Sequence, residues 1–357
     1  RNNPDALSSF PKVIQTDCSP DFMGDPARSV WEDIMNLLVN AAAGLIAGLF
    51  AVSGPAHAFP DRPISIIVPW AAGGGTDAVV RTFAAGFQEE LGVPDNVINR
   101  TGGGGITGHS AIINAEADGY TLGAASPEIG LYRTLGTADI SLDDLDLFSR
   151  LAIIPAGVTV AADSPFETLE QLIAAVRSEP AGTYSSSGTG VGGSWHVAAG
   201  GLLAAADIDP QKLKWVPSQG GAPALMEVMS GGITMFTGSP VEALSLLEAG
   251  RVRTLAVMLD ERSETFPDAP TVKEAIGKDW SYANWFALVA PKGINAEARD
   301  ILYQAAARAN ARPEVQSSLK ERGITPVWDA PGEFDAFAAD FTAKAKSVLE
   351  GLGLAKN

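Results

Sequence analysis

The segment Pro63 to Arg81, PISIIVPWAAGGGTDAVVR, constrains the fold more than any other part of the chain. Its apolar run Ile64–Val68 predicts a buried strand, and a helical pattern begins after Gly73–Gly75. Glycines at such a turn let the backbone approach a ligand, and the first amide groups of a helix attract anions. Two interpretations stay open: a seat for a carboxylate or phosphate, or a tight turn capped by Thr76 or Asp77.

Short apolar segments alternate with helical patterns through most of the chain, which predicts α/β architecture with largely parallel sheets. In such sheets, ligands bind beyond the carboxyl ends of the strands. The predicted strands are Ile64–Val68, Val97–Asn99, Thr121–Ala125, Val158–Ala161, Tyr184–Ser185, Lys214–Val216, Thr234–Phe236, Thr254–Val257 and Phe286–Val289. The predicted helices are Asp77–Leu91, Leu169–Ser178, Trp195–Ala206, Ala222–Ser230, Val241–Glu248, Ala296–Ala311, Glu314–Arg322 and Glu333–Leu352.

The 357 residues leave room for two domains, and the formal net charge of −17 bears on the partners. No cluster of lysine or arginine offsets this charge, so the sequence predicts no nucleic-acid binding. A small acidic ligand has to be held locally, against the overall field. Backbone amides can hold it without adding charge.

An apolar run, Leu37–Val52, precedes the sequence Ala56-His57-Ala58. This pattern predicts a secretory signal that is cut after Ala58, so residues 1–58 are treated as a leader and the protein is expected in the periplasm. A retained membrane anchor is the alternative, although the run is short for a span. The single cysteine, Cys18, lies before the cut, which leaves no cysteine chemistry in the mature chain.

Four loops rich in glycine or hydroxyl residues each follow a predicted strand and precede a helical pattern. They are Ala72–Asp77, Ser185–Gly190, Gly102–Gly108 and Ser218–Ala222. Amides and hydroxyls in this setting suit an anionic head group. Trp70, between the first strand and its loop, is the best candidate for an aromatic pocket wall, and most other aromatic residues are expected in the core.

Other chemistries find little support. Gly103-x-Gly105-x-x-Gly108 matches a dinucleotide fingerprint, but a second match in the chain shows how easily the pattern arises, and the acid at the expected offset, Glu128, is not at a strand end. No G-x-S-x-G motif surrounds a serine, so Ser194 beside His196 is not interpreted as a triad. His196 is expected to pack or to cap a helix. The sequence predicts no catalytic residue, no metal site and no cofactor.

An ordered series of segments carries a family resemblance over residues 59–350. They are FPDRPISIIVPWAAGGGTD, the Gly102–Gly108 loop, ADGYTL, YSSSGTGVGGSWH, VPSQGGAPALMEVMSGG, EAGRVRTLAV, ERSETFPDAPTVKEA and WFALVAPKG. The chain resembles the substrate-binding receptors of tripartite tricarboxylate transporters, also called Bug receptors. The resemblance implies a fold like that of the type II periplasmic binding proteins, with two lobes and mixed or parallel sheets flanking a ligand cleft. One lobe is expected to span 59–156 plus 290–357, and the other 157–289.

The resemblance also implies how the ligand is held: backbone N–H groups and hydroxyls of two facing loops grip its carboxylate, Asp77 orients the first loop, and Ala222 and Pro223 lie at the cleft. Ser218 and Glu128 are departures from the family pattern. If Glu128 faces the cleft, it would repel a second carboxylate or hold an amine, so ligand identity stays open. The expected ligand-binding residues are Trp70, Ala72, Gly73, Gly74, Gly75, Thr76, Asp77, Ser185, Ser186, Ser187, Gly188, Thr189, Gly190, Ser218, Ala222 and Pro223.

The function implied is capture of a small organic acid, such as a di- or tricarboxylate, by a monomer that delivers it to membrane transporter subunits. The alternatives are an exported enzyme, hydrolytic or nucleotide-dependent, and a ligand sensor for a signalling partner. The substitutions Asp77→Ala and Gly188→Val are each expected to weaken ligand binding while leaving the fold intact.

Overall fold

The computed structural model describes residues 35, 37, 59–218 and 220–356. The predictions on the cut after Ala58 and on Cys18 lie outside these residues, as does Gln219 of the loop Ser218–Ala222. The described residues from Phe59 onward belong to one compact unit, which contains the features discussed below. In the described part, no helix is both long enough and apolar enough to cross a membrane.

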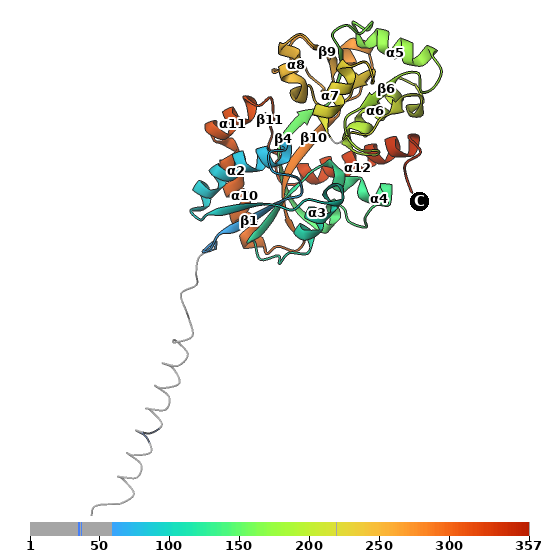
Figure 1. The fold of residues 1–357 in the computed structure, drawn as a ribbon. Helices are drawn as coiled ribbons and strands as arrows, with labels where there is room; N and C mark the ends of the chain where they lie inside the picture. The colour runs from blue at the N-terminus through green and yellow to red at the C-terminus, as the bar shows by residue number, and fades with distance from the viewer. Residues whose placement is uncertain (1–34, 36, 38–58, 219, 357) are drawn as a thin grey trace, which may run out of the picture. The chain divides into compact units, whose positions relative to one another are not determined.

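The first sheet has six strands in the order β11-β4-β10-β3-β1-β2, in the lower part of the compact unit in Figure 1. Strands β2, β1 and β3 are parallel, whereas β10 is antiparallel to β3 and β4, as β11 is to β4. The strands are β1 (Ile64–Val68), β2 (Asp95–Asn99), β3 (Thr121–Ala125), β4 (Leu145–Pro155), β10 (Ala283–Pro291) and β11 (Thr325–Pro326).

Helices cover both faces of this sheet, as the two clusters of buried apolar side chains show. On one face α2 (Gly75–Leu91), α10 (Ala296–Ala311) and α11 (Pro313–Lys320) pack on the side chains of Ile64 and Ile66. On the other, α3 (Ile106–Ile113), α4 (Tyr132–Leu135) and α12 (Glu333–Gly351) pack with Ile67 and Ala287. Because both faces are covered, a central strand such as β10 carries a continuous apolar run, Trp285–Ala290. The 3₁₀ turns are η1 (Gly103–Gly105), η2 (Pro127–Gly130) and η3 (Leu142–Asp144).

The second sheet has five strands in the order β7-β6-β8-β5-β9, and it is mixed as well. Strand β6 is parallel to β7 and β8, and β5 is antiparallel to β8 and β9. Its strands are β5 (Gly157–Ala161), β6 (Ser185–Ser187), β7 (Lys214–Trp215), β8 (Met235–Phe236) and β9 (Val252–Val257). Its helices are α5 (Leu169–Ser178), α6 (Ser194–Ala205), η4 (Pro210–Lys212), α7 (Gly221–Met229), η5 (Pro240–Ala243), α8 (Leu244–Glu248) and α9 (Val272–Ile276).

The chain passes between the two sheets at two neighbouring points. Strand β4 leads into β5 through Ala156, whose N–H donates to Tyr282 O at 2.9 Å and whose O accepts from Met258 N–H at 2.8 Å. Tyr282 precedes β10, which belongs to the six-stranded sheet, so the second crossing falls at Tyr282–Ala283 and not at the expected boundary after Val289. The sequence pattern showed a strand here, but not which sheet it joins.

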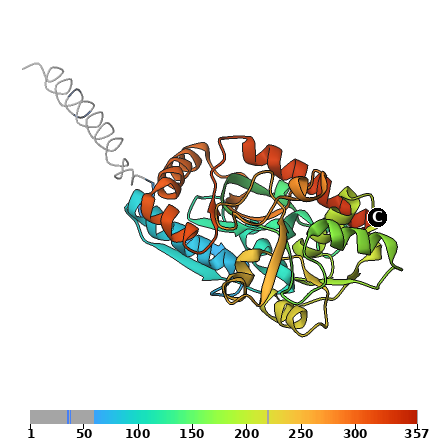
Figure 2. The same ribbon diagram turned by 90° about the horizontal axis from the view of Figure 1, so that it is seen from above.

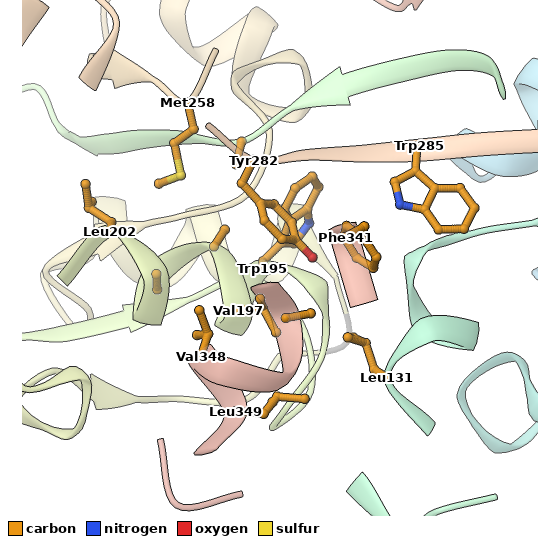
Figure 3. Close-up of a cluster of buried hydrophobic side chains, with 14 of the residues drawn as sticks. Leu131, Trp195, Val197, Leu202, Met258, Tyr282, Trp285, Phe341, Val348 and Leu349 are labelled. Atoms are coloured by element: carbon orange, nitrogen blue, oxygen red, sulfur yellow. The ribbon is translucent and has the colours of Figure 1, made fainter. Parts of the chain in front are cut away.

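One hydrophobic cluster continues through these crossings and contains Trp195, Met258, Tyr282, Trp285 and Phe341 (Figure 3). It also includes the C-terminal half of α12, which Figure 2 shows beside the helices of the second sheet. Contact there is close: a Cβ on Gly200 of α6 would lie 2.9 Å from Val348 Cγ1. The segment 290–357 therefore packs against both sheets.

The strand Ile64–Val68 and the helix Ala296–Ala311 are as the sequence predicts. The mixed sheets that the family resemblance implies are confirmed, whereas the largely parallel sheets expected from the alternation of segments are not seen. Strand β4 was not predicted, because Ser149 and Arg150 interrupt its apolar run. In the structure these residues pair with Asp329: Asp329 N–H donates to Ser149 Oγ at 2.7 Å, and Arg150 Nη2 donates to Asp329 Oδ1 at 2.7 Å.

Candidate ligand-binding cleft

A cavity of about 410 Å³ lies between elements of the two sheets. The first sheet contributes a wall of aromatic, aliphatic and glycine residues, and the second contributes the loop that precedes α6. The lining residues are Trp70, Gly103, Gly104, Ile106, Glu128, Leu131, Tyr132, Leu135, Thr137, Thr189, Gly190, Val191, Gly192, Gly193 and Ser218. Of the residues expected from the sequence, this cavity brings together Trp70, Thr189, Gly190 and Ser218.

The loop before α6 is fixed by a neutral side chain. Gly192 has a φ of 73°, and its N–H donates to Nδ1 of His196 at 3.0 Å. The imidazole stacks on Trp215 with the ring centroids 4.3 Å apart. Burial lowers the pKa of His196 to about 4, so the acceptor is uncharged at neutral pH. Of the two roles expected for His196, packing is confirmed, whereas the N-cap of α6 is Gly193 and has no side-chain cap.

Thr189 lines this cavity and has a hydroxyl group without a partner among the described residues. Its backbone O accepts from Ser218 N–H at 3.1 Å and from Trp215 Nε1 at 3.3 Å, which fixes the residue. Its Oγ1 is buried and has no hydrogen-bond partner among the described residues. Buried hydroxyls in native proteins nearly always have a partner, so this group is suited to a polar ligand atom.

The opposite wall carries an acid in a short hydrogen-bond chain. Trp70 Nε1 donates to Ser126 Oγ at 3.0 Å, and Ser126 Oγ donates to Glu128 Oε2 at 2.8 Å. Burial raises the pKa of Glu128. This answers the question that the sequence left open, since Glu128 does face the cleft.

Gly103 and Gly104, in a run of four glycines, form the next part of the wall. Gly102 to Gly105 all have positive φ, at 134°, 57°, 64° and 95°, which other residues rarely adopt. Tyr132 OH donates to Gly104 O at 2.8 Å and lies 3.0 Å from His109 Nδ1. Burial lowers the pKa of His109 to about 3, so this support is also uncharged.

The loop Ala72–Asp77 lines neither this cavity nor the smaller one described below. Ala72 to Gly75 are exposed, and the helix is capped by Gly74, not by Thr76 or Asp77. Asp77 does orient the loop, as expected: its Oδ2 accepts from Gly73 N–H at 2.8 Å. Burial raises the pKa of Asp77, but hydrogen bonds from Arg81, Gly73 and Asn99 outweigh burial and hold the pKa below its ordinary value.

The remaining expected residues have other places. Ser187, Ser218 and Pro223 line a second cavity of about 300 Å³, where Ser187 Oγ is buried without a partner among the described residues. Ser185 Oγ accepts from Thr234 N–H at 3.3 Å, Ser186 Oγ lies 2.9 Å from Thr237 Oγ1, and Ala222 is exposed.

Gly188 packs against α6 and leaves no room for a side chain. A Cβ there would lie 2.7 Å from Trp195 Cβ. The expectation that Gly188→Val leaves the fold intact is therefore corrected.

Sequence reasoning missed most of the wall from the first sheet. Gly103 and Gly104 were noticed as a loop but not selected, and Tyr132 was expected in the core. The aliphatic residues Ile106, Leu131 and Leu135 carry no chemical signal of their own. In the described ranges, no group of three or more His, Cys, Asp or Glu side chains is arranged to hold a metal ion.

The fold and the cavity define the class of protein. Two mixed sheets with covering helices flank a ligand cleft, the architecture of a solute-binding protein like the type II periplasmic binding proteins. A family model described as the tripartite tricarboxylate transporter family receptor, TctC, matches residues 79–354. The chain belongs to this family, whose members are solute-binding receptors and not enzymes.

Individual relatives agree with this assignment. The UPF0065 protein in the gbd 5′ region of Cupriavidus necator is 32% identical, over 88% of this chain and 96% of its own length. BugT of Bordetella pertussis is 28% identical, over 88% of this chain and 97% of its own. A TctC solute-binding protein from Polaromonas is 30% identical with a TM-score of 0.72, covering 82% of this chain and 99% of its own. An R. palustris protein solved with adipate is 26% identical with a TM-score of 0.71, covering 83% of this chain and 99% of its own.

Proposed function

We propose that the protein captures a small organic acid in the cavity between its sheets and delivers it to a tripartite tricarboxylate transporter in the membrane. The observation that carries the proposal is the cavity itself, which is lined from both sheets by residues that include Thr189, whose buried hydroxyl has no partner among the described residues. The R. palustris relative solved with adipate supports a carboxylate as the ligand.

Binding would draw the two sheets together about the crossings at Ala156 and Tyr282, since a ligand that contacts both sides favours the closed arrangement. Receptors of this family are periplasmic. In our proposal this chain is exported likewise and works as a monomer.

The first experiment is a thermal-shift screen against mono-, di- and tricarboxylates and amino acids, followed by calorimetry on the best compound. A ligand of the folded state raises the melting temperature by mass action. Thr189→Val keeps the shape of the side chain and removes its hydroxyl, so we expect about a 10-fold loss of affinity. Thr183→Val, at an exposed position, is the matched control and should bind normally. A screen in which no organic acid raises the melting temperature would contradict the proposal.

Delivery is tested separately, by uptake of the radiolabelled ligand into vesicles that contain the transporter subunits. Uptake that depends on added receptor supports transport. Binding without uptake would point to the sensor alternative.

A further inference from the structure

The cavity is charged on one side only. Among the described residues that line it, Glu128 is the one with an ionisable carboxylate, and no lysine, arginine or histidine joins it. The other lining groups are aromatic, aliphatic, glycine or hydroxyl residues. A ligand that carries only carboxylates would meet a like charge here, with no cation of the protein in the wall to offset it.

Glu128 is held firmly toward this cavity. Ser126, which is 2% exposed at the end of β3, donates its hydroxyl hydrogen to Glu128 Oε2 at 2.8 Å. The Ser126 oxygen in turn accepts from Trp70 Nε1 at 3.0 Å, so the hydroxyl cannot turn toward another acceptor without losing a partner. The nearby phenol of Tyr132 donates to Gly104 O instead. Glu128 therefore has a fixed position and forms no ion pair in the described part of the chain.

A carboxylate in such a place is costly to keep ionised, because burial raises its pKa and no cation of the protein compensates. An ammonium group of the ligand would supply the missing charge and hydrogen-bond donors. A charge-assisted N–H···O bond in a partly desolvated site is stronger than a neutral one.

The side of the cavity opposite Glu128 has no acidic residue among its described lining residues and is suited to an anion. Thr189 lines this side, with a buried hydroxyl that has no hydrogen-bond partner among the described residues, and the loop Gly190–Gly193 precedes α6, at the positive end of that helix. A carboxylate suits this side. The cavity thus has one wall for an anion and one for a cation, with apolar side chains such as Leu131 and Leu135 between them.

Building on the proposed function, we propose that Glu128 is a specificity-determining residue and that the protein selects an amino acid, with a carboxylate on the α6 side, an ammonium group on Glu128 and an apolar body, over a dicarboxylate. This commits the site to one ligand class.

Calorimetry with four compounds of the same carbon chain length tests the proposal: caproate, adipate, ε-aminocaproate and norleucine. The first has one carboxylate, the second has two, and the others add an ammonium group at the far end or beside the carboxylate. We expect at least one of the two amines to bind about 30-fold more tightly than caproate, the effect of a desolvated charge pair. Adipate should bind most weakly.

Glu128→Gln keeps the shape and removes the charge, so the order should reverse: the preferred amine loses about 30-fold, whereas caproate and adipate gain affinity. Glu116→Gln removes the same charge at an exposed position and should leave the order unchanged. Tighter binding of adipate or caproate than of both amines overturns this inference and leaves the proposed function standing. If no organic acid binds at all, the proposed function fails with it. The wild-type series is decisive even if the variant fails to fold.

Discussion

The starts of α2 and α6 share one backbone design and differ in the group that holds it. In α2, Gly74 N–H donates to Ala71 O, and Gly73, with a φ of 82°, donates to Asp77 four residues on. In α6, Gly193 N–H donates to Gly190 O, and Gly192, with a φ of 73°, donates to His196 four residues on. The capping glycines have nearly the same angles, with φ of −77° in α2 and −71° in α6.

The difference lies in charge. Asp77 is a carboxylate whose charge is offset by Arg81, four residues on, whereas His196 is uncharged and has Gly200 at that place. A negative charge at a helix start competes with an anionic ligand for the same amides. The start of α6, which His196 holds without a formal charge, lines the cavity. The start of α2, which the charged Asp77 holds, lies outside it. The comparison teaches that the same turn can be held either by a charged side chain or by a neutral one.

The largest expected effect comes from breaking the charged clamp. Asp77→Ala removes an acceptor that serves Gly73, Arg81 and Asn99 in a buried position, so the free energy of unfolding should fall by about 3 kcal/mol. Urea unfolding measures the change. Asp340→Ala breaks an exposed pair with the same spacing and should cost less than about 0.5 kcal/mol. Equal losses in both variants would refute a clamp at Asp77.

The hydrogen bond from Gly192 to the neutral imidazole of His196 should make the stability of the fold depend on pH. The unfolded state protonates His196 near its ordinary pKa of 6.5, and the folded state only near about 4, so the unfolded state binds more protons between these values. Stability is therefore lost as pH falls from 7 to 5, by on the order of 2 kcal/mol for this residue. His196→Asn should have a correspondingly flatter profile than the wild type. Asp95 and His109 are present in both proteins, so their contributions to the pH dependence of stability should be the same in each. If the stability–pH profiles of the wild type and of His196→Asn are parallel, His196 is not a buried neutral imidazole.

A negative charge in place of His196, at the start of α6, is expected to weaken ligand binding. His196→Asp supplies the acceptor of α2 without its arginine, so affinity for caproate should fall by about 10-fold. The uncharged His196→Asn should stay within about 3-fold of the wild type. Calorimetry measures both, and an aspartate variant that binds caproate normally would mean that the carboxylate does not lie at α6.

The smallest effects come from matched glycines. A Cβ on Gly193 would lie 2.7 Å from Thr189 Oγ1, whereas one on Gly74 would lie 3.3 Å from Ala71 O. Gly193→Ala should therefore displace the Thr189 hydroxyl and weaken caproate binding by about 3-fold, and Gly74→Ala should leave affinity unchanged. A loss of affinity in Gly74→Ala would bring the loop Ala72–Asp77 into the ligand site.

How far the sequence predicts this molecule depends on how local each signal is. Strand β1, its glycine turn and α2 follow from residues that are adjacent in the chain. Strand β4 does not, because the polar groups of Ser149 and Arg150 are satisfied by Asp329, about 180 residues away in the sequence. The sheet to which β10 belongs depends on long-range pairing in the same way.

The site shows the same division. Thr189 and Ser218 stand out by composition, since hydroxyls beside glycines indicate polar binding. Leu131, Tyr132 and Leu135 look like ordinary core residues in sequence, and only the fold brings them opposite the loop before α6. Glu128 lies between these two cases. The sequence shows that it is an acidic residue, but its fixed position at the cavity depends on Ser126 and Trp70.

The apolar cluster that runs through the crossings has a consequence for how the molecule comes apart. Trp195 and Leu202 lie on α6, a helix of the second half, and Trp285 lies on β10 of the first sheet, yet they share this cluster with Val348 and Leu349 of α12. Neither half can lose its packing without exposing apolar surface of the other, so the two halves should melt in one cooperative transition. Heating should therefore not unfold one half of the molecule while the other half stays folded.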